Sequence, residues 1–395
     1  MADKVVVLDS HAFKDNRISK HIGSVSAHYP VLRLNFNFYA DRMIETPDGE
    51  KAQVFNGGNL KNPYLNGMLF TVRNMLGYSR GIEKLLRKDF VKNDDRVLFH
   101  VHDPYVLGLA HKLKRKFPGS HVVYDRHEYY DAWRNRLGFS SPGLLEKLYS
   151  RCVDEVVIVS RDYKGKIKNL EERPVSVVPN YPLVRSFSPE AVKDKLKEFE
   201  RTGRTEAVYF GVLNLDFDRD IRLMFELAEG MMSADERINF TVAGRIDHEG
   251  VWPLIKQAEE RFPQQMRYLG EIPYSEVVRR TQEAHLGFLL LDPSNLMFSE
   301  EMPNSSNKVY EYLLSGTVPV VRAVIDDSQV ISGCSLLFDR NATKEDMLKD
   351  MLELTSDRER MAAMMRRCYE IGSTLSWEDF SKEYLNIYER LFRSM

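Results

Sequence analysis

Short runs of apolar, β-branched residues alternate with amphipathic segments along nearly the whole chain. In the first half these runs predict strands at Val5–Leu8, Val31–Phe36, Arg96–Val101, His121–Tyr124, Glu155–Val159 and Val175–Val178. In the second half they predict strands at Ala207–Phe210, Ile238–Ala243, Met266–Leu269 and Leu286–Leu291. Because strands that alternate with helices build parallel sheets covered on both faces, the pattern predicts an α/β protein.

The amphipathic segments between these runs predict helices. The predicted helices are Tyr105–Phe117, Ile221–Met232, Val251–Phe262, Tyr274–Ala284 and Trp377–Phe392, together with residues 344–372. A chain of 395 residues is too long for a single core, so we expect two domains joined near Pro182–Pro189. Residues 41–68 are polar and rich in Gly, Asn and Pro, and we expect them to form an excursion loop.

The cysteine content and hydropathy of the chain indicate the cellular compartment in which it works. Its three cysteines, Cys152, Cys334 and Cys368, are too widely spaced for a zinc or disulfide framework, and they fit a reducing compartment. The opening Met-Ala-Asp-Lys-Val-Val-Val-Leu-Asp is expected to be a first strand, because its apolar run is too short for a signal peptide. No apolar run approaches the roughly 20 residues of a membrane-spanning helix. These features predict a cytoplasmic protein.

The charge of the chain is unevenly distributed. Residues 1–186 hold 30 Lys and Arg against 21 Asp and Glu, and the remaining residues hold 26 against 37. The two halves therefore carry +9 and −11, which agrees with the net charge of −2 for the whole chain. A basic first half indicates an anionic surface or partner, although halves of long chains also drift in charge by chance.

The run of residues 304–321 is a candidate phosphate site. It predicts a polar loop, a short helix that ends at a glycine, and an apolar strand. Ser306 or Asn307 can cap the helix, whose free N–H groups and positive dipole end attract an anion. Lys308 adds a cation where the dipole disfavours it unless an anion is bound, and Glu311 lies one turn further on. An ordinary αβ unit with a capped helix gives the same pattern, so both interpretations stay open at this point.

Sequence signatures of other nucleotide-binding proteins are missing. The first predicted strand leads into Asp9-Ser-His-Ala-Phe-Lys-Asp-Asn-Arg, which lacks the GxGxxG of dinucleotide-binding folds. The chain also has no Walker A sequence. These absences argue against a dehydrogenase. Two Rossmann-like domains would instead form a ligand site in a cleft between the carboxyl ends of two sheets.

An ordered series of short motifs resembles the GT-B glycosyltransferases of family 4. In the second half the motifs are Tyr209-Phe-Gly-Val-Leu with Arg219 downstream, Val242-Ala-Gly-Arg, Leu269-Gly-Glu-Ile-Pro, His285-Leu-Gly-Phe-Leu-Leu-Leu, and Asn307-Lys-x-x-Glu-Tyr-x-x-x-Gly-x-x-Pro-Val. In the first half they are Asp15-Asn-Arg-Ile, His100-Val-His-Asp-Pro and Tyr124-Asp-Arg-His-Glu-Tyr, followed by Val178-Pro-Asn-Tyr at the junction and Ser376-Trp-Glu near the end. The likeness covers nearly the whole chain in the order of the family.

The resemblance implies a fold and a role for each domain. Residues 1–184 would form an acceptor-binding Rossmann-like domain, and residues 185–375 would form the nucleotide-sugar donor-binding domain. The two domains would face each other across a cleft. The C-terminal helix, within residues 376–395, would return to the N-terminal domain.

The resemblance also implies which residues bind the donor. The implied diphosphate ligands are Arg219, Ser306, Asn307 and Lys308, with Glu311 on the ribose and Ile272 beside the base. The other implied nucleotide-sugar-binding residues are Gly211, Gly244 and Ser305. Two cations and a helix N-terminus would stabilise the leaving diphosphate without a metal, so we expect no metal and no other cofactor.

One position departs from the pattern of the family. Family 4 commonly has two glutamates eight positions apart, and the first of them faces the donor sugar. Counting back from Glu311, that position is Pro303, and Glu300 and Glu301 lie nearby but out of register. Either Glu301 or the backbone amides around residues 304–305 would have to take over the contact with the sugar.

On the acceptor side the resemblance places a histidine beside the reacting sugar, which maps to His127. This side chain would bind a donor-sugar hydroxyl or orient the acceptor, unless it only pairs with a carboxylate such as Glu128. His102 and Asp103 lie at the end of the preceding strand, where Asp103 can also cap the next helix. The remaining candidates are Asp15 and Arg17, which can also form a mutual ion pair without a ligand.

The function implied is that of a retaining glycosyltransferase. It would move a sugar from a nucleotide-diphosphate sugar to a hydroxyl of a glycan or lipid-linked acceptor, in the synthesis of cell-surface polysaccharide or glycolipid. Alternatives are a sugar-nucleotide epimerase, a non-catalytic nucleotide-sugar binding protein, and a metal hydrolase that uses His100, His102, Asp103, His127 and Glu128. The basic segment His111–Phe117 is either a solvated helix face or a peripheral contact with an anionic membrane. No nucleic-acid partner is expected.

Overall fold

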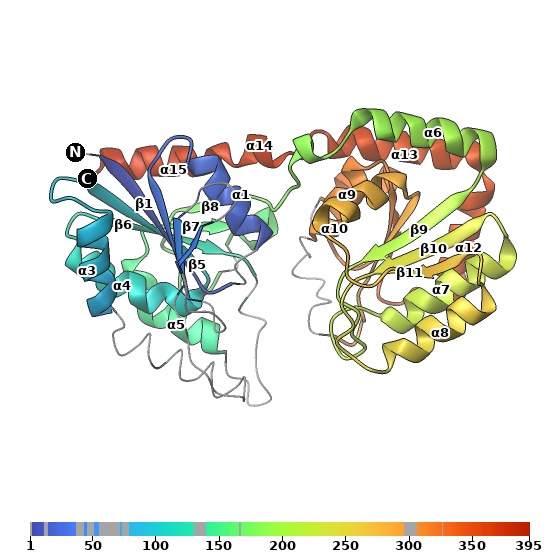
Figure 1. Cartoon of the computed structure of the whole chain (residues 1–395), viewed down its shortest axis with the longest axis horizontal. Helices are drawn as coiled ribbons and strands as arrows, with labels where there is room; N and C mark the ends of the chain where they lie inside the picture. Colours follow the sequence, from blue (N-terminus) through green and yellow to red (C-terminus); the bar gives the residue numbers. More distant parts are fainter. Residues whose placement is uncertain are drawn as a thin grey trace. The chain divides into compact units, whose positions relative to one another are not determined.

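The chain folds into two compact units, described by a computed structural model (Figure 1). The first unit consists of Met1–Pro179 and Glu378–Met395, and the second consists of Asn180–Trp377. The structure describes residues 2–11, 15–36, 43–45, 51–54, 72, 79–128, 130, 140–165, 167–295, 306–325 and 327–395.

The first unit is built on an eight-stranded sheet in the order β3-β4-β2-β1-β5-β6-β7-β8. All strand pairs are parallel except β3 with β4. The strands are β1 (Asp3–Asp9), β2 (Val31–Asn35), β3 (Met43–Glu45), β4 (Lys51–Val54), β5 (Arg96–His102), β6 (His121–Arg126), β7 (Glu155–Ile158) and β8 (Val175–Val177).

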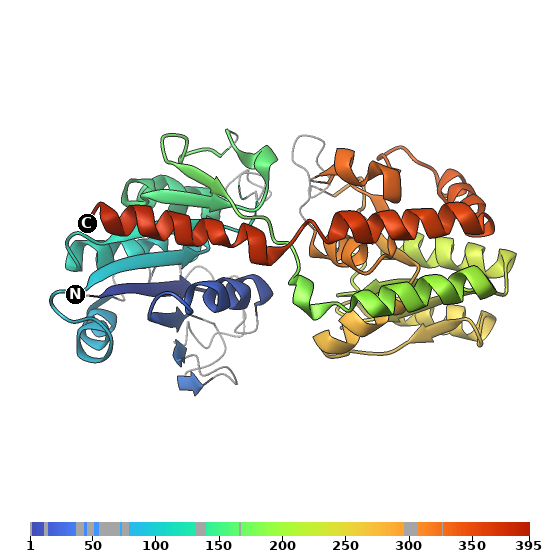
Figure 2. The same cartoon turned by 90° about the horizontal axis from the view of Figure 1, so that it is seen from above.

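Helices cover both faces of this sheet, as Figures 1 and 2 show. Helix α1 lies beside α15 on one face, and α3, α4 and α5 lie on the other. Their bounds are α1 (Asn16–Val25), α3 (Ser79–Asp89), α4 (Leu107–Lys116), α5 (Ser141–Tyr149), α14 (Trp377–Phe380) and α15 (Lys382–Arg393). The C-terminal helix α15 packs on β5 and α1, which confirms the predicted return of the chain to its first domain.

The second unit is built on a six-stranded parallel sheet in the order β11-β10-β9-β12-β13-β14. The strands are β9 (Thr205–Phe210), β10 (Ile238–Ala243), β11 (Met266–Tyr268), β12 (Leu286–Leu290), β13 (Val318–Arg322) and β14 (Leu336–Phe338). The helices are α6 (Pro189–Thr202), α7 (Ile221–Ala234), α8 (Val251–Arg261), α9 (Tyr274–Glu283), α10 (Asn307–Leu314), α11 (Ser328–Ile331), α12 (Lys344–Ser356) and α13 (Arg358–Gly372). Helices α7 and α8 cover one face, and α9, α10 and α13 cover the other (Figure 1).

Each sheet has a point where the order of its strands reverses. In the first unit this point lies between β1 and β5, and in the second it lies between β9 and β12. Connections leave to opposite faces at such a point, so the carboxyl ends of the two strands open a crevice in which α/β proteins bind ligands. Both groups of candidate site residues follow strands at these positions.

The predicted α/β architecture with two parallel sheets is confirmed. The structure differs in two local respects. Strands β3 and β4 lie inside the segment expected to be a loop. They form a short antiparallel pair that extends the edge of the first sheet. The predicted long helices end early, at Asp357 between α12 and α13 and at Ser381 between α14 and α15. None of the described helices is long and apolar enough to cross a bilayer.

Candidate functional site

Three loops at the carboxyl edge of the second sheet are bonded to one another through their backbones. The Gly211 N–H donates to Ala243 O at 2.9 Å, and the Gly244 N–H donates to Gly270 O at 2.8 Å. Gly244 has φ of 141°, and a Cβ there would lie 1.8 Å from Gly211 O. Because glycine has no side chain, the backbones of these loops can approach one another closely at Gly211 and Gly244, and neither residue fills this edge of the sheet.

Lys308 extends from the first turn of α10 over this backbone. Its Nζ lies 2.8 Å from where a Cβ on Gly211 would be, and 5.5 Å from the centre of the Tyr209 ring. Among the described residues the ammonium group has no hydrogen bond and no ion pair. Burial, followed by the charge of Arg219, lowers the pKa of Lys308 to about 8. The site therefore holds a cation that forms no ion pair with any residue the structure describes.

Arg219 is the second cation at this edge. Its backbone forms an antiparallel bridge with Leu291, directly after β12, which places it at the reversal point of the sheet. Its guanidinium group donates to the Asp218 carboxylate. Burial raises the pKa of Tyr209 and lowers that of Lys308, and the charge of Arg219 acts to lower both, so the structure brings the two predicted cations together around Tyr209.

The N-terminus of α10, at the same place, is open with respect to the residues that the structure describes. Ser306 is buried and has extended backbone angles, but its side chain makes no capping hydrogen bond. Asn307 Oδ1 is buried without a hydrogen-bond partner among the described residues. Free N–H groups, the helix dipole and two cations together give a positive site suited to an anion such as a phosphate.

The remaining donor-side candidates lie around this positive site. Glu311 Oε1 accepts a hydrogen bond of 2.7 Å from the Tyr274 hydroxyl, at the start of α9. Ile272 packs against the apolar cluster that includes Phe210 and Tyr312 under the sheet edge. Ser305 lies outside the described residues, as do Glu300, Glu301 and Pro303.

A second group of side chains follows β1, β5 and β6 at the reversal point of the first sheet. The side chains are His11 after β1, His102 and Asp103 at the end of β5, and His127 after β6. The structure thus brings the predicted His102, Asp103 and His127 together, and it adds His11.

A buried ion pair supports this group. Arg17 Nη2 donates to Asp125 Oδ1 at 2.9 Å, Arg17 Nη1 donates to Val178 O at 2.9 Å, and the Tyr384 hydroxyl donates to Asp125 Oδ2 at 2.6 Å. Burial opposes ionisation of Asp125, but the Arg17 charge together with His100, His127 and His102 outweighs it and holds the pKa of Asp125 well below its usual range. Arg17 is only 3% exposed, so it orients Asp125 and cannot contact an acceptor. The mutual ion pair of Arg17 with Asp15 is also wrong, because Asp15 instead caps α1 by accepting from the Ile18 N–H at 2.9 Å.

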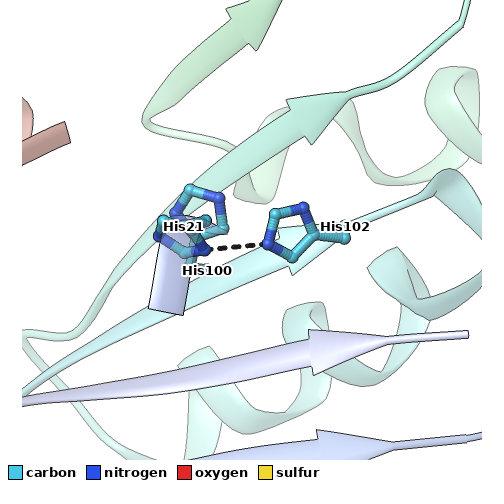
Figure 3. Close-up of side chains that lie close together, drawn as sticks. All are labelled: His21, His100 and His102. Atoms are coloured by element: carbon cyan, nitrogen blue, oxygen red, sulfur yellow. Dashed lines mark hydrogen bonds between the residues drawn. The ribbon is translucent and has the colours of Figure 1, made fainter. Parts of the chain in front are cut away.

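Four histidines form the centre of the cluster. His100 and His102 lie two residues apart on β5 and therefore share one face of the sheet, against which α1 places His21 (Figure 3). His21 Nδ1 lies 3.0 Å from His102 Nε2, and His102 Nδ1 lies 2.8 Å from His127 Nε2. His127 therefore bonds to another histidine, and the expected alternative of a bond to Glu128 is replaced by this contact. Glu128 lies half-buried in the turn that follows.

Asp103 also differs from its expected alternative role. It has φ of 81° and makes no capping hydrogen bond to the helix that follows. Its carboxylate instead accepts from the Tyr130 hydroxyl and lies 2.6 Å from His11 Nε2. Burial alone would lower the pKa of His11, but the Asp103 carboxylate raises it to about 9. His11 therefore carries a positive charge at neutral pH, and its ring stacks on His127 with 4.5 Å between centroids.

Two groups in this cluster have metal-ligating side chains close together. The ligand atoms of His21, His100 and His102 lie within 4.8 Å of one another, and so do those of His102, Asp125 and His127. However, nitrogens 2.8 to 3.0 Å apart already share protons in pairs, and Asp125 is neutralised by Arg17. The arrangement therefore favours a hydrogen-bonded network over a metal centre, which argues against a metal hydrolase.

Several residues of these sites had no signal in the sequence. His21 lies within a helix, and Tyr384 and Tyr388 come from the far end of the chain. Their contribution depends on tertiary packing, which no local pattern reveals. His11 follows the first strand at the correct edge of the sheet, so its position after β1 could have identified it.

Comparison with known proteins gives structural neighbours only. The sequence matches no family model, and no curated protein gives a significant match. The fold is similar to sucrose-phosphate synthase from Thermosynechococcus elongatus, with a TM-score of 0.72, 13% identity and 100% of both chains covered. It is also similar to the UDP-forming α,α-trehalose-phosphate synthase from Burkholderia vietnamiensis (TM-score 0.68, 12% identity) and to Anabaena HepE in complex with UDP (TM-score 0.69, 11% identity). Each of these two alignments covers 98% of this chain and 100% of the neighbour. These similarities show that the chain has the GT-B fold.

Proposed function

We propose that this protein is a retaining glycosyltransferase that uses a nucleotide-diphosphate sugar as its donor. The observation that carries the proposal is the Lys308 ammonium group, which lies beside Arg219 and the open N-terminus of α10 without an anionic partner among the described residues. A diphosphate supplies the charge that this site lacks. The similarity to HepE, solved with UDP, and to a UDP-forming synthase supports a nucleoside diphosphate as the ligand.

Within this proposal each unit has its own role. Residues 180–377 bind the donor, with Lys308 and Arg219 on the diphosphate and Glu311 on the ribose hydroxyls. Because Lys308 and Arg219 are fixed before the reaction, they stabilise the charge that develops on the leaving diphosphate, and no metal is needed for this step. The first unit supplies His127 and binds the acceptor, whose hydroxyl attacks on the face from which the diphosphate leaves.

The proposed acceptor is a glycan or a lipid-linked sugar, handled in the cytoplasm. The basic segment of α4 adds little support for a contact with an anionic membrane. Lys114 Nζ lies on the Asp154 carboxylate and donates to Cys152 O at 3.0 Å, and Lys116 Nζ is 3.6 Å from Glu83. Paired lysines attract anionic headgroups less than free ones.

A thermal-shift panel of UDP, GDP, ADP and CMP sugars tests the donor proposal. A ligand that binds only the folded state at 100 times its Kd stabilises the protein by about 2.7 kcal/mol, which is readily measured. We expect one nucleotide to raise the Tm of the wild type but not of Lys308→Met. Lys344→Met is the matched control, because Lys344 in the same unit already pairs with Glu226 at 3.0 Å. Equal shifts for the wild type and Lys308→Met would refute the assigned site.

Product analysis separates the proposed function from its alternatives. NMR of the product should show that the anomeric configuration of the donor sugar is kept, and an inverted product would refute retention. Release of nucleotide without any acceptor would indicate an epimerase. Binding of a nucleotide sugar without turnover, over a panel of acceptors, would indicate a non-catalytic binding protein.

A further inference from the structure

The side chains beneath His127 form one continuous chain of hydrogen bonds. The Tyr388 hydroxyl lies 2.8 Å from His100 Nδ1 and 2.7 Å from His21 Nε2. His21 Nδ1 lies 3.0 Å from His102 Nε2, and His102 Nδ1 lies 2.8 Å from His127 Nε2. His21, His100, His102 and Tyr388 are fully buried, so water does not compete for these bonds.

The protons of this chain are strongly coupled. A neutral imidazole has one N–H donor and one bare nitrogen acceptor, and a tyrosine hydroxyl has one proton to donate. Each bond therefore fixes the direction of the next, and only two arrangements satisfy all four bonds while the Tyr388 hydroxyl also donates its proton within the chain. In the outward arrangement every proton points toward His127, which is then protonated on Nδ1. In the inward arrangement every proton points toward His100, and His127 is protonated on Nε2.

The Asp125 carboxylate distinguishes the two arrangements. It lies 3.6 Å from His100 Nε2, 3.6 Å from His102 Nδ1 and 3.9 Å from His127 Nε2. In the inward arrangement two of these three nitrogens carry a proton and one is bare, whereas in the outward arrangement one carries a proton and two are bare. Since an ionised carboxylate only accepts hydrogen bonds, and the site is buried, the inward arrangement is favoured.

We propose that Asp125, acting through His100, Tyr388, His21 and His102, holds His127 as the Nε2–H tautomer, so that Nδ1 of His127 accepts a hydrogen bond from a sugar hydroxyl. The identity of that hydroxyl rests on the proposed function, whereas the tautomer does not. Nδ1 of His127 has no hydrogen bond among the described residues, and the side chain is 8% exposed. The other five side chains are positioning residues, because they act only through His127.

The charged groups around His127 agree with a neutral ring. Burial, followed by the charge of His11, lowers the pKa of His127 to about 4, against the opposing influence of Asp125 and Asp103. Arg17 on α1 acts in the same direction as His11. His127 therefore stays neutral at pH 7, as an acceptor must.

The test is ¹⁵N NMR of the histidine rings in the full-length, ligand-free protein. Protonated and bare ring nitrogens resonate at well-separated frequencies, and His127→Gln assigns the signals of His127. We expect a single Nε2–H tautomer in the wild type. Tyr388→Phe should give a mixture of both tautomers at His127, because it disconnects His100 from His21. Tyr124→Phe is the control: it removes a fully buried hydroxyl of the same unit, which donates to Glu146 at 2.9 Å and lies outside the chain, and it should leave the tautomer unchanged.

Kinetics add a second measurement once the donor is known. Tyr388→Phe should lower kcat/KM by about tenfold, the effect of losing one well-placed hydrogen bond in part of the population. An Nδ1–H tautomer at His127 in the wild type would overturn the proposal, and so would a stoichiometric metal ion bound to His102 and His127. The expected tautomer in a protein that binds no nucleotide sugar would support the tautomer assignment and refute the proposed function instead.

Discussion

Replacing Lys308 by Met should stabilise the ligand-free protein while it removes donor binding. Lys308 is a half-buried cation that has no anionic partner among the described residues. The pKa of this lysine falls from the ordinary 10.5 to about 8, a shift that corresponds to roughly 3 kcal/mol of unfavourable desolvation at neutral pH. Methionine fills a similar space without the charge. The free energy of unfolding should therefore rise by about 1 to 3 kcal/mol, since part of the penalty is lost to solvent.

The gain in the free energy of unfolding of Lys308→Met should decrease as the pH rises. Below pH 8, Lys308 is charged in both the folded and the unfolded state, so the wild type carries the full penalty. Between pH 8 and 10.5 the unfolded state binds more protons than the folded state, and the stability of the wild type rises relative to Lys308→Met. The advantage of the variant should consequently shrink across this window and be lost above it.

Urea denaturation at pH 7 and at pH 10 measures both effects. Lys344→Met, which removes an exposed lysine paired with Glu226, should change stability by less than about 0.5 kcal/mol at either pH. A destabilised Lys308→Met protein that still binds the nucleotide would refute the reasoning, because Lys308 would then be a structural residue and no diphosphate ligand.

Other substitutions test the surrounding geometry. Gly244→Ala should destabilise the protein by about 2 to 4 kcal/mol in denaturant unfolding, since φ is 141° and the new Cβ meets backbone, whereas Gly333→Ala, with nothing within 4 Å, should be nearly neutral. Glu311→Ala should weaken nucleotide binding by about tenfold or more in calorimetry, and unchanged affinity would remove Glu311 from the ribose. Arg17→Leu should cost about 3 to 5 kcal/mol, because the buried Asp125 carboxylate would lose its cationic partner; a melting temperature equal to that of the wild type would contradict this.

Much of the fold follows from local sequence. The β-branched run Ile238–Ala243 appears as a strand with the predicted bounds, and Tyr274–Glu283 ends within one residue of its prediction. Periodicity and turn residues suffice for such elements because each buries one face against an adjacent layer. Strands β3 and β4 escaped notice because they are short and extend the edge of a sheet, where pairing with a neighbour decides the structure more than composition does.

The two candidate sites were predictable to different degrees. The donor side lies on loops that directly follow strands, where the pattern of residues 304–321 predicted Lys308 and the resemblance to family 4 implied Arg219 and Gly244. The histidine cluster depends on side chains that meet through packing. His100 and His102 share a strand, but nothing in the sequence indicates that His21 and Tyr388 complete their hydrogen bonds.

Because α15 returns to the first unit, the two units complete their folding in a defined order during synthesis. Residues 180–377 form a continuous segment that contains every strand of its own sheet, so this unit can fold as soon as it leaves the ribosome. The first unit is synthesised earlier but lacks Tyr384 and Tyr388 until residues 378–395 have been made. Until then Asp125, Arg17, His21 and His100 are without those partners, so the first unit completes its fold after the second.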